Sequence, residues 1–128
     1  MRRALLCLAV GLACAGRPEP QGADAALFQS WVRVAEEEAP ENLVQIYRPG
    51  GLEDFPPSRF RERYVFHADG RCEWSSLDAA DAHATQSGTW SLDAARLLRV
   101  RDRAGHVAAS FRIVVLKAEL LELTPLEP

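Results

Sequence analysis

Apolar and polar residues alternate in several short segments of this chain, most clearly between residues 60 and 67. There Phe60, Tyr64 and Phe66 fall on one face, and basic residues dominate the other. A spacing of two predicts a β-strand with one buried face. By this alternation, or by their content of β-forming residues, we expect eight strands, at 31–37, 43–48, 60–67, 71–77, 85–91, 96–101, 107–116 and 120–124.

Turn-forming residues separate these segments, and Asp69-Gly70 is the strongest hairpin signal among them. Strands joined by short turns pair in the antiparallel sense, and about eight strands can close a small barrel. The sequence therefore predicts an all-β fold, a small antiparallel up-and-down barrel of about eight strands. Both a completely closed and an incompletely closed barrel fit the sequence, and a β-sandwich is the alternative fold.

Two segments carry more specific expectations. Residues 24–35 also fit a helix, because Leu27, Phe28 and Trp31 share a helical face; we expect one helical turn and then a strand. The longest strand, 107–116, has a continuous apolar face that is expected to point into the core. Its members are Val107, Ala109, Phe111, Ile113 and Val115.

The N-terminus has the pattern of an export signal. Arg2 and Arg3 precede an uncharged apolar run, 4–13, which is too short to span a bilayer as a helix. We therefore expect residues 1–13 to be a signal peptide. The residues before Cys14 resemble the end of a bacterial lipobox, which predicts cleavage before Cys14 and lipidation of its thiol. The alternatives are cleavage after Ala15 with plain secretion, and an uncleaved apolar N-terminus.

The remaining cysteines and the linker follow from this assignment. Residues 14–26 are rich in Ala, Gly, Pro and polar residues, which predicts a flexible tether before a single domain at 27–128. Cys7 lies in the signal, and Cys14 is lipidated or removed, so Cys72 has no expected disulfide partner. Because Cys72 alternates with Trp74, we expect a buried and unreactive thiol. The protein is expected at the bacterial cell envelope, facing the periplasm, or in the secreted fraction.

Composition supports one globular domain and argues against nucleic acid as a partner. The chain has 128 residues, of which 48% are hydrophobic and 26% charged. Its net charge is −3, and loss of the two arginines of the signal makes it −5 (−3 − 2). Nucleic-acid binding depends on neutralising phosphates with basic side chains, so an acidic domain without a basic helical face excludes that class.

Three segments, taken in order, resemble the bacterial lipocalin-like domains. They are YVFHADG at 64–70, SGTWSL at 87–92 and IVVLKAELLEL at 113–123. In that family an F-x-x-D-G hairpin, a G-x-W strand and a closing leucine-rich hairpin recur in this order, and Trp31 is similar to its first-strand tryptophan. The resemblance implies a small barrel that binds a small apolar ligand in an exported, lipid-anchored protein.

Aromatic residues spread over the expected strands are the candidate ligand site. They are Trp31, Tyr47, Phe66, Trp74, Trp90 and Phe111. One hypothesis is that they line a cavity for an apolar ligand; the other is that they fill the core of a structural or interaction module that contacts another envelope protein. Inward-facing rings that touch would leave no room for a ligand. Gly88 is expected where Trp90 or an adjacent strand approaches closely.

Charged residues form two stripes and one cluster. The stripes are Arg59, Arg61 and Arg63, and Arg99, Arg101 and Arg103; the cluster is Glu36, Glu37, Glu38 and Glu41. Each stripe predicts either an anion-binding surface or, as we favour, a solvated outer face. The acidic cluster lacks the converging pattern of a calcium loop, so we expect a solvated turn.

Catalytic and metal-binding patterns are missing from the sequence. The three histidines, His67, His83 and His106, each lie beside a turn without a second ligand at metal-binding spacing. No serine has the surroundings of a nucleophile elbow. We therefore expect no enzymatic activity, no metal and no cofactor.

Overall fold

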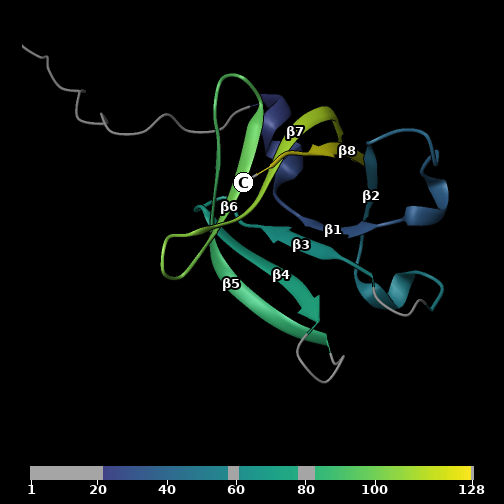
Figure 1. Ribbon diagram of the computed structural model, residues 1–128, viewed down its shortest axis with the longest axis horizontal. Coiled ribbons are helices and arrows are strands. Elements are labelled where there is room, and N and C mark those ends of the chain that lie inside the picture. Colours follow the sequence, from purple (N-terminus) through teal and green to yellow (C-terminus); the bar gives the residue numbers. More distant parts are fainter. Residues whose placement is uncertain (1–21, 58–60, 78–82, 128) are drawn as a thin grey trace, which may run out of the picture.

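The computed structural model describes residues 22–57, 61–77 and 83–127. Its eight strands form a closed antiparallel barrel in the order β1-β2-β8-β7-β6-β5-β4-β3 (Figure 1). The strands are β1 (Ser30–Arg33), β2 (Gln45–Pro49), β3 (Arg63–Phe66), β4 (Arg71–Leu77), β5 (His83–Leu92), β6 (Leu97–Asp102), β7 (Val107–Lys117) and β8 (Leu120–Pro125). The all-β up-and-down barrel is confirmed, and its closure is complete. Residues 1–21, with the expected signal and Cys14, lie outside the described residues.

The order of the strands differs from a simple meander at one point. Strands β3 to β8 each pair with their neighbour in sequence, but β1 lies between β2 and β3. The chain therefore passes from one side of β1 to the other between residues 50 and 62. This connection contains a short 3-10 helix, η4 (Leu52–Asp54). The register Tyr64↔Trp74 and the pair Phe66↔Cys72 then begin the regular hairpins.

The first segments of the domain contain more helical turns than the alternation predicts. Residues 22–26, expected in the tether, belong to a 3-10 helix, η2 (Gly22–Leu27). This helix confirms the expected turn before the first strand. Strand β1 ends at Arg33 instead of residue 37, because residues 35–37 form another 3-10 turn, η3 (Ala35–Glu37). β3 begins at Arg63 rather than residue 60, and Phe60 lies outside the described residues.

The expected continuous apolar face of β7 is wrong at both ends. The pairing with β6 shifts between Val100 and Arg101, and the pairing with β8 shifts between Ile113 and Val115. Each β-bulge inserts one residue and so reverses the face of the residues beyond it. Val107 then lies opposite the outward Arg101, and Leu116 replaces Val115 in the core.

The core occupies the barrel interior and continues onto η2, which lies against β7 (Figure 1). Leu27 at the end of η2 is fully buried, and its carbonyl accepts a hydrogen bond from Trp31 Nε1 at 3.1 Å. Gln29 Nε2 donates to Ala118 O, at the turn between β7 and β8, at 3.0 Å. The helical turn thus joins the start of β1 to the closing hairpin and covers this end of the core.

Candidate functional site

The structure brings the six predicted aromatic residues together inside the barrel. Five of them are buried, and the sixth, Trp90, is partly buried and packs against the same cluster. They come from β1, β2, β3, β4, β5 and β7, so almost every part of the wall contributes one. The buried members are Trp31, Tyr47, Phe66, Trp74 and Phe111.

Tyr64 and Phe111 meet across the barrel. β3 and β7 are four strands apart in either direction around the closed sheet, yet the ring centroids of Tyr64 and Phe111 are 5.7 Å apart in an edge-to-face contact. Tyr64 also stacks on Phe66 at 5.8 Å and meets Tyr47 at 6.1 Å. These are ordinary contact distances between packed rings. The lumen is therefore filled by side chains at this level.

A second group of rings continues the core toward η2. Phe66 meets Trp90 edge to face at 6.0 Å, and Trp90 meets Phe28 at 5.8 Å. Trp90 Nε1 donates to His67 O at 2.8 Å. The alternation in 60–67 already placed Tyr64 inward, but its role as the bridge to Phe111 depends on the barrel radius, which no local pattern encodes.

Several polar atoms of the interior are used by the fold itself. The indole N–H groups of Trp31 and Trp90 donate to backbone carbonyls, and the Tyr47 hydroxyl donates to Gln45 Oε1 at 2.9 Å. Burial raises the pKa of both Tyr47 and Tyr64, which keeps the two hydroxyls neutral. A ligand site usually offers a few convergent polar groups; the two indole N–H groups and the Tyr47 hydroxyl are already engaged.

Ion pairs connect η3 to the strands beside it. Arg33 makes a bidentate contact with Glu38, at 2.8 and 2.9 Å, and its Nη1 lies 2.9 Å from Glu62 Oε1. Glu38 Oε2 also accepts the N–H of Ile46 at 3.0 Å. The hydrogen bonds from Arg33 lower the pKa of the Glu38 carboxyl below its usual range and raise that of Arg33. The end of β1 and the start of β2 are joined through these charges.

The prediction of a solvated stripe is wrong at Arg61. This residue is only 8% exposed to solvent. The guanidinium makes a bidentate pair with Glu36 at 2.9 and 3.0 Å, and it donates to Arg33 O and to Pro56 O. Its Cζ also lies 5.8 Å from the centre of the Phe55 ring. Arg61 therefore fastens the connection between β2 and β3 to η3 and to the end of β1. Arg59 lies outside the described residues.

The acidic cluster lies on an exposed turn, as expected, but most of its carboxylates are paired. Three of its carboxylates each pair with a different arginine, and Glu41 is exposed. The strongest effect is at Glu36, where hydrogen bonds from Arg61 lower the pKa to about 2. Guanidinium groups thus occupy the oxygens that a calcium ion would need. The pairs are Glu36 with Arg61, Glu37 with Arg48, and Glu38 with Arg33.

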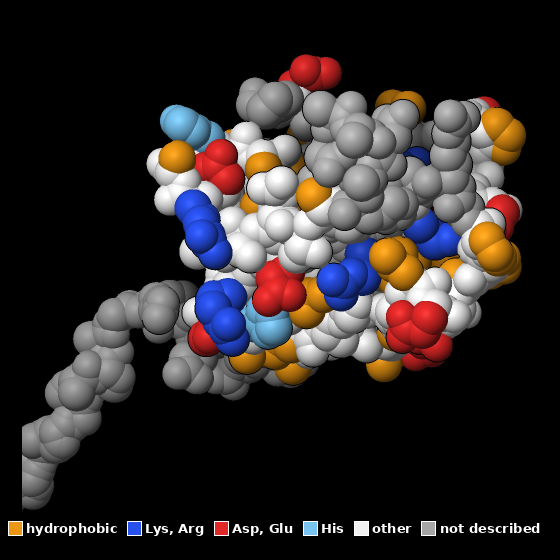
Figure 2. Space-filling model, turned by 90° about the horizontal axis from the view of Figure 1, so that it is seen from below, with side chains coloured by type: hydrophobic (Ala, Val, Ile, Leu, Met, Phe, Trp, Pro, Cys, Tyr) orange, Lys and Arg blue, Asp and Glu red, His pale blue; other side chains and the backbone are white. Residues whose placement is uncertain are grey.

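The second arginine stripe agrees with the expected outer face. Arg99 and Arg101 alternate along β6 with the fully buried Leu98 and Val100. Arg99 lies 3.7 Å from Asp93, a distance typical of a loose surface pair. Figure 2 shows basic and acidic side chains interspersed with scattered apolar ones over the described part of the face seen from below.

Among the described residues, neither Cys72 nor the histidines form a metal-binding group. Cys72 is 1% exposed, which confirms the expected buried, free thiol, and burial raises its pKa to about 12. In the described parts of the chain, His67 Nε2 is buried without a hydrogen-bond partner, 3.6 Å from Glu73 Oε2. No three His, Cys, Asp or Glu residues among those described are placed to hold a metal ion. The His83 side chain lies outside the description.

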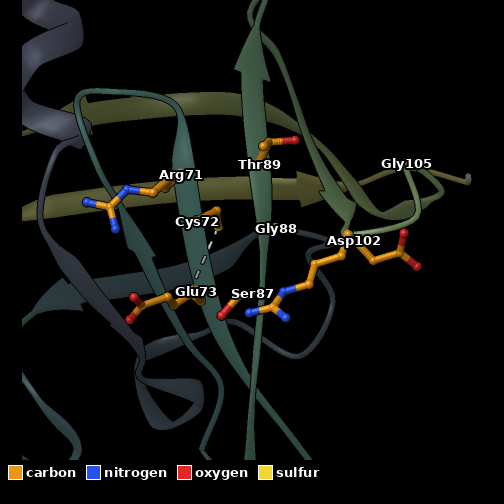
Figure 3. Close-up of a pocket in the computed structure, with 9 residues that line it drawn as sticks. Arg71, Cys72, Glu73, Ser87, Gly88, Thr89, Asp102 and Gly105 are labelled. Atoms are coloured by element: carbon orange, nitrogen blue, oxygen red, sulfur yellow. Dashed lines mark hydrogen bonds between the residues drawn. The ribbon is translucent and has the colours of Figure 1, made fainter.

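A hollow of about 530 Å³ lies where β6 ends beside β4 and β5 (Figure 3). Its charged groups are largely committed: Arg71 pairs with Asp69 at 2.8 Å, and Asp102 accepts the backbone N–H groups of the adjoining turn. Both signs of charge occur around it, so it does not favour one class of charged ligand. The lining residues are Arg71, Cys72, Glu73, Ser87, Gly88, Thr89, Asp102, Arg103 and Gly105.

Gly88 is required by the close approach of β5 and β6 beside this hollow. A Cβ atom at residue 88 would collide with the backbone oxygen of Arg101, so no side chain fits at this position. The expectation that an adjacent strand approaches Gly88 is confirmed.

No helix among the described residues is long and apolar enough to cross a membrane. A scan of protein-family models and searches of curated proteins and of solved structures found no match to this chain.

Proposed function

We propose that this protein is an exported, lipid-anchored, lipocalin-like barrel with a filled core that acts through its outer surface by contacting another envelope protein. The observation that supports this best is the contact between Tyr64 and Phe111 across the barrel. A carrier of a small apolar ligand needs an enclosed volume of some hundreds of Å³. Here aromatic rings from opposite strands occupy that space.

The sequence supports the anchoring part of the proposal. The apolar run 4–13 and the lipobox-like residues before Cys14 are the pattern of a lipoprotein signal. A lipid on Cys14 would hold the barrel beside the membrane. The resemblance of 64–70, 87–92 and 113–123 to lipocalin-like domains agrees with the barrel fold and is the basis for describing it as lipocalin-like.

The described residues also favour binding over catalysis. The one cysteine among them is buried with a raised pKa, and most of the carboxylates around η3 are paired with arginines. Catalysis requires a nucleophile or an acid–base pair that can reach a substrate. The groups most suited to such roles are engaged inside the fold.

Binding of benzene tests whether the interior is filled. Benzene enters an engineered apolar cavity and avoids a packed core. We expect no saturable binding to the wild type by NMR chemical-shift titration, and binding to the cavity variant Phe111→Ala, with Leu98→Ala as the second cavity variant should the first not fold. Saturable binding to the wild type would contradict the filled core and favour a carrier of an apolar ligand.

Photo-crosslinking in the native envelope tests the surface contact. Photoreactive residues at outward positions such as Arg101 and Val114 are compared with one at the inward Leu98. We expect a discrete crosslinked protein from at least one outward position and none from Leu98. Absence of crosslinks from a full set of outward positions would contradict the interaction module.

A further inference from the structure

The His67 ring turns one nitrogen into the protein beside a carboxylate. Its Nε2 atom is buried without a hydrogen-bond partner and lies 3.6 Å from Glu73 Oε2. The two side chains as a whole are 31% and 39% exposed, so the rest of each side chain still meets water. A buried polar atom without a partner costs free energy. The atom therefore gains most from a state in which it bonds to Glu73.

The main chain on both sides of this contact is fixed. His67 N donates to Arg71 O at 2.9 Å, and His67 O accepts hydrogen bonds from Gly70 N at 3.0 Å and from Trp90 Nε1 at 2.8 Å. Glu73 belongs to β4 and is in register with β3. A charge-assisted hydrogen bond has a length of about 2.8 Å. A side-chain movement of less than about 1 Å, with no change of backbone, is therefore enough to form one.

The other charged side chains next to this contact cancel each other. Arg71 Nε pairs with Asp69 Oδ2 at 2.8 Å, and Figure 3 shows Arg71 and Glu73 extending from β4 toward the same side. On β5, the residues opposite these two are the uncharged Thr89 and Ser87. Among the described residues, Glu73 is thus the carboxylate within ion-pair distance of the imidazole.

We propose that His67 and Glu73 form a pH-sensitive switch. When the imidazole takes up a proton, its Nε2–H donates to the Glu73 carboxylate and fastens the residue after β3 to β4. Histidine is the side chain that ordinarily changes charge between about pH 5 and 8, and both of its nitrogens are donors only when it is charged. The contact therefore stabilises the fold at mildly acidic pH, and this contribution is lost as the pH rises toward 8.

The switch acts on the hollow beside β6, because Glu73 is part of its wall. The charged side chains that line this hollow are two of each sign, Arg71 and Arg103 against Glu73 and Asp102. A protonated His67 neutralises Glu73 and leaves the basic side chains in excess. The hollow thus changes from balanced charge to positive charge at acidic pH. This inference goes beyond the proposed function and does not depend on a filled core or on an envelope partner.

Thermal unfolding of the mature protein at about pH 5.5 and about pH 8 tests the switch. His67→Gln keeps a polar side chain that cannot become charged. Relative to the wild type at the same pH, we expect its unfolding midpoint to fall by about 3 °C or more at the lower pH and by less than about 1 °C at the higher pH. In a Glu73→Gln background, His67→Gln should have the same small effect at both pH values, because the partner charge is gone.

His106→Gln is the matched control, because the His106 ring also lies near a carboxylate, 3.8 Å from Asp102 Oδ2, but its side chain is 82% exposed. We expect its midpoint to stay within about 1 °C of the wild type at both pH values. A loss in His67→Gln that is equal at the two pH values, or that persists in the Glu73→Gln background, would overturn the switch. Neither result would affect the benzene and crosslinking tests of the proposed function.

Discussion

The interior of the barrel and the segment around η3 are stabilised by different kinds of contact. Inside, rings from opposite strands exclude water, and burial of apolar surface supplies the favourable free energy. Around η3, guanidinium–carboxylate pairs join segments that are distant in sequence, as in Arg33 with Glu62 and Arg61 with Glu36. Partly exposed ion pairs contribute less than buried rings and respond to pH and salt. The comparison suggests that the barrel closes through its core, while charges fix the path by which the chain crosses β1.

Removal of Phe111 has the largest expected effect and tests how much the packed interior contributes to stability. Phe111→Ala deletes a 5% exposed ring that spans the barrel, and we expect it to lower the free energy of unfolding by about 3–5 kcal/mol. Urea unfolding followed by tryptophan fluorescence measures the loss. Val114→Ala, at a 49% exposed position on the same strand, should change stability by less than about 0.5 kcal/mol. Similar effects of the two changes would contradict a core packed across the lumen.

Gly88 tests whether the interior also depends on close backbone approach. A methyl group at Gly88 would collide with the carbonyl of Arg101. Because the colliding group of Arg101 belongs to the backbone, only movement of a strand could relieve the collision. We expect Gly88→Ala to destabilise the protein by about 1–3 kcal/mol, measured by the same urea unfolding. Thr89→Ala, one residue further along β5, is the control and should have little effect. A neutral Gly88→Ala would mean that β5 and β6 are not held this close.

Arg61 tests the ionic side through its pH dependence. The Glu36 pKa is lowered from 4.5 to about 2 by hydrogen bonds from Arg61, so the pair stabilises the fold fully above pH 4.5 and loses this contribution as the pH falls toward 2. Arg61→Gln should therefore be less stable than the wild type at pH 7, and the difference should shrink between pH 4.5 and 2. Thermal unfolding at a series of pH values measures it.

Arg99→Gln, whose partner Asp93 lies 3.7 Å away, is the control and should show a much smaller difference at pH 7. A difference between Arg61→Gln and wild type that stays constant with pH would show that Arg61 acts through packing alone. In that case the ionic side of the comparison would be wrong.

The sequence predicted the repeating parts of the fold well and the exceptions poorly. Alternation and the Asp69-Gly70 turn identify β3 and β4, because these signals are local. The bulges near Val114 and Val107 went unpredicted, since an inserted residue leaves the apolar composition unchanged. Arg61 was misplaced for a related reason: a strand pattern assigns it to an outer face, whereas its partners lie 25 residues away at Glu36 and in the preceding loop.

The candidate site shows the same limit. Every one of the six predicted aromatic residues lies in or against the core, because tryptophan and phenylalanine on alternating positions reliably turn inward. Whether such residues surround a cavity or fill it depends on the barrel's width and on contacts between opposite strands. Only the three-dimensional arrangement places Tyr64 against Phe111.

The mass of the mature protein, taken gently from its own envelope, tests the central claim of a filled and ligand-free interior most directly. Native and denaturing mass spectrometry are compared on the same sample. We expect a denatured mass with a lipid-sized excess at Cys14, and a native mass that is a whole multiple of it. A further small mass present only under native conditions would contradict the filled core and identify a ligand held inside the barrel.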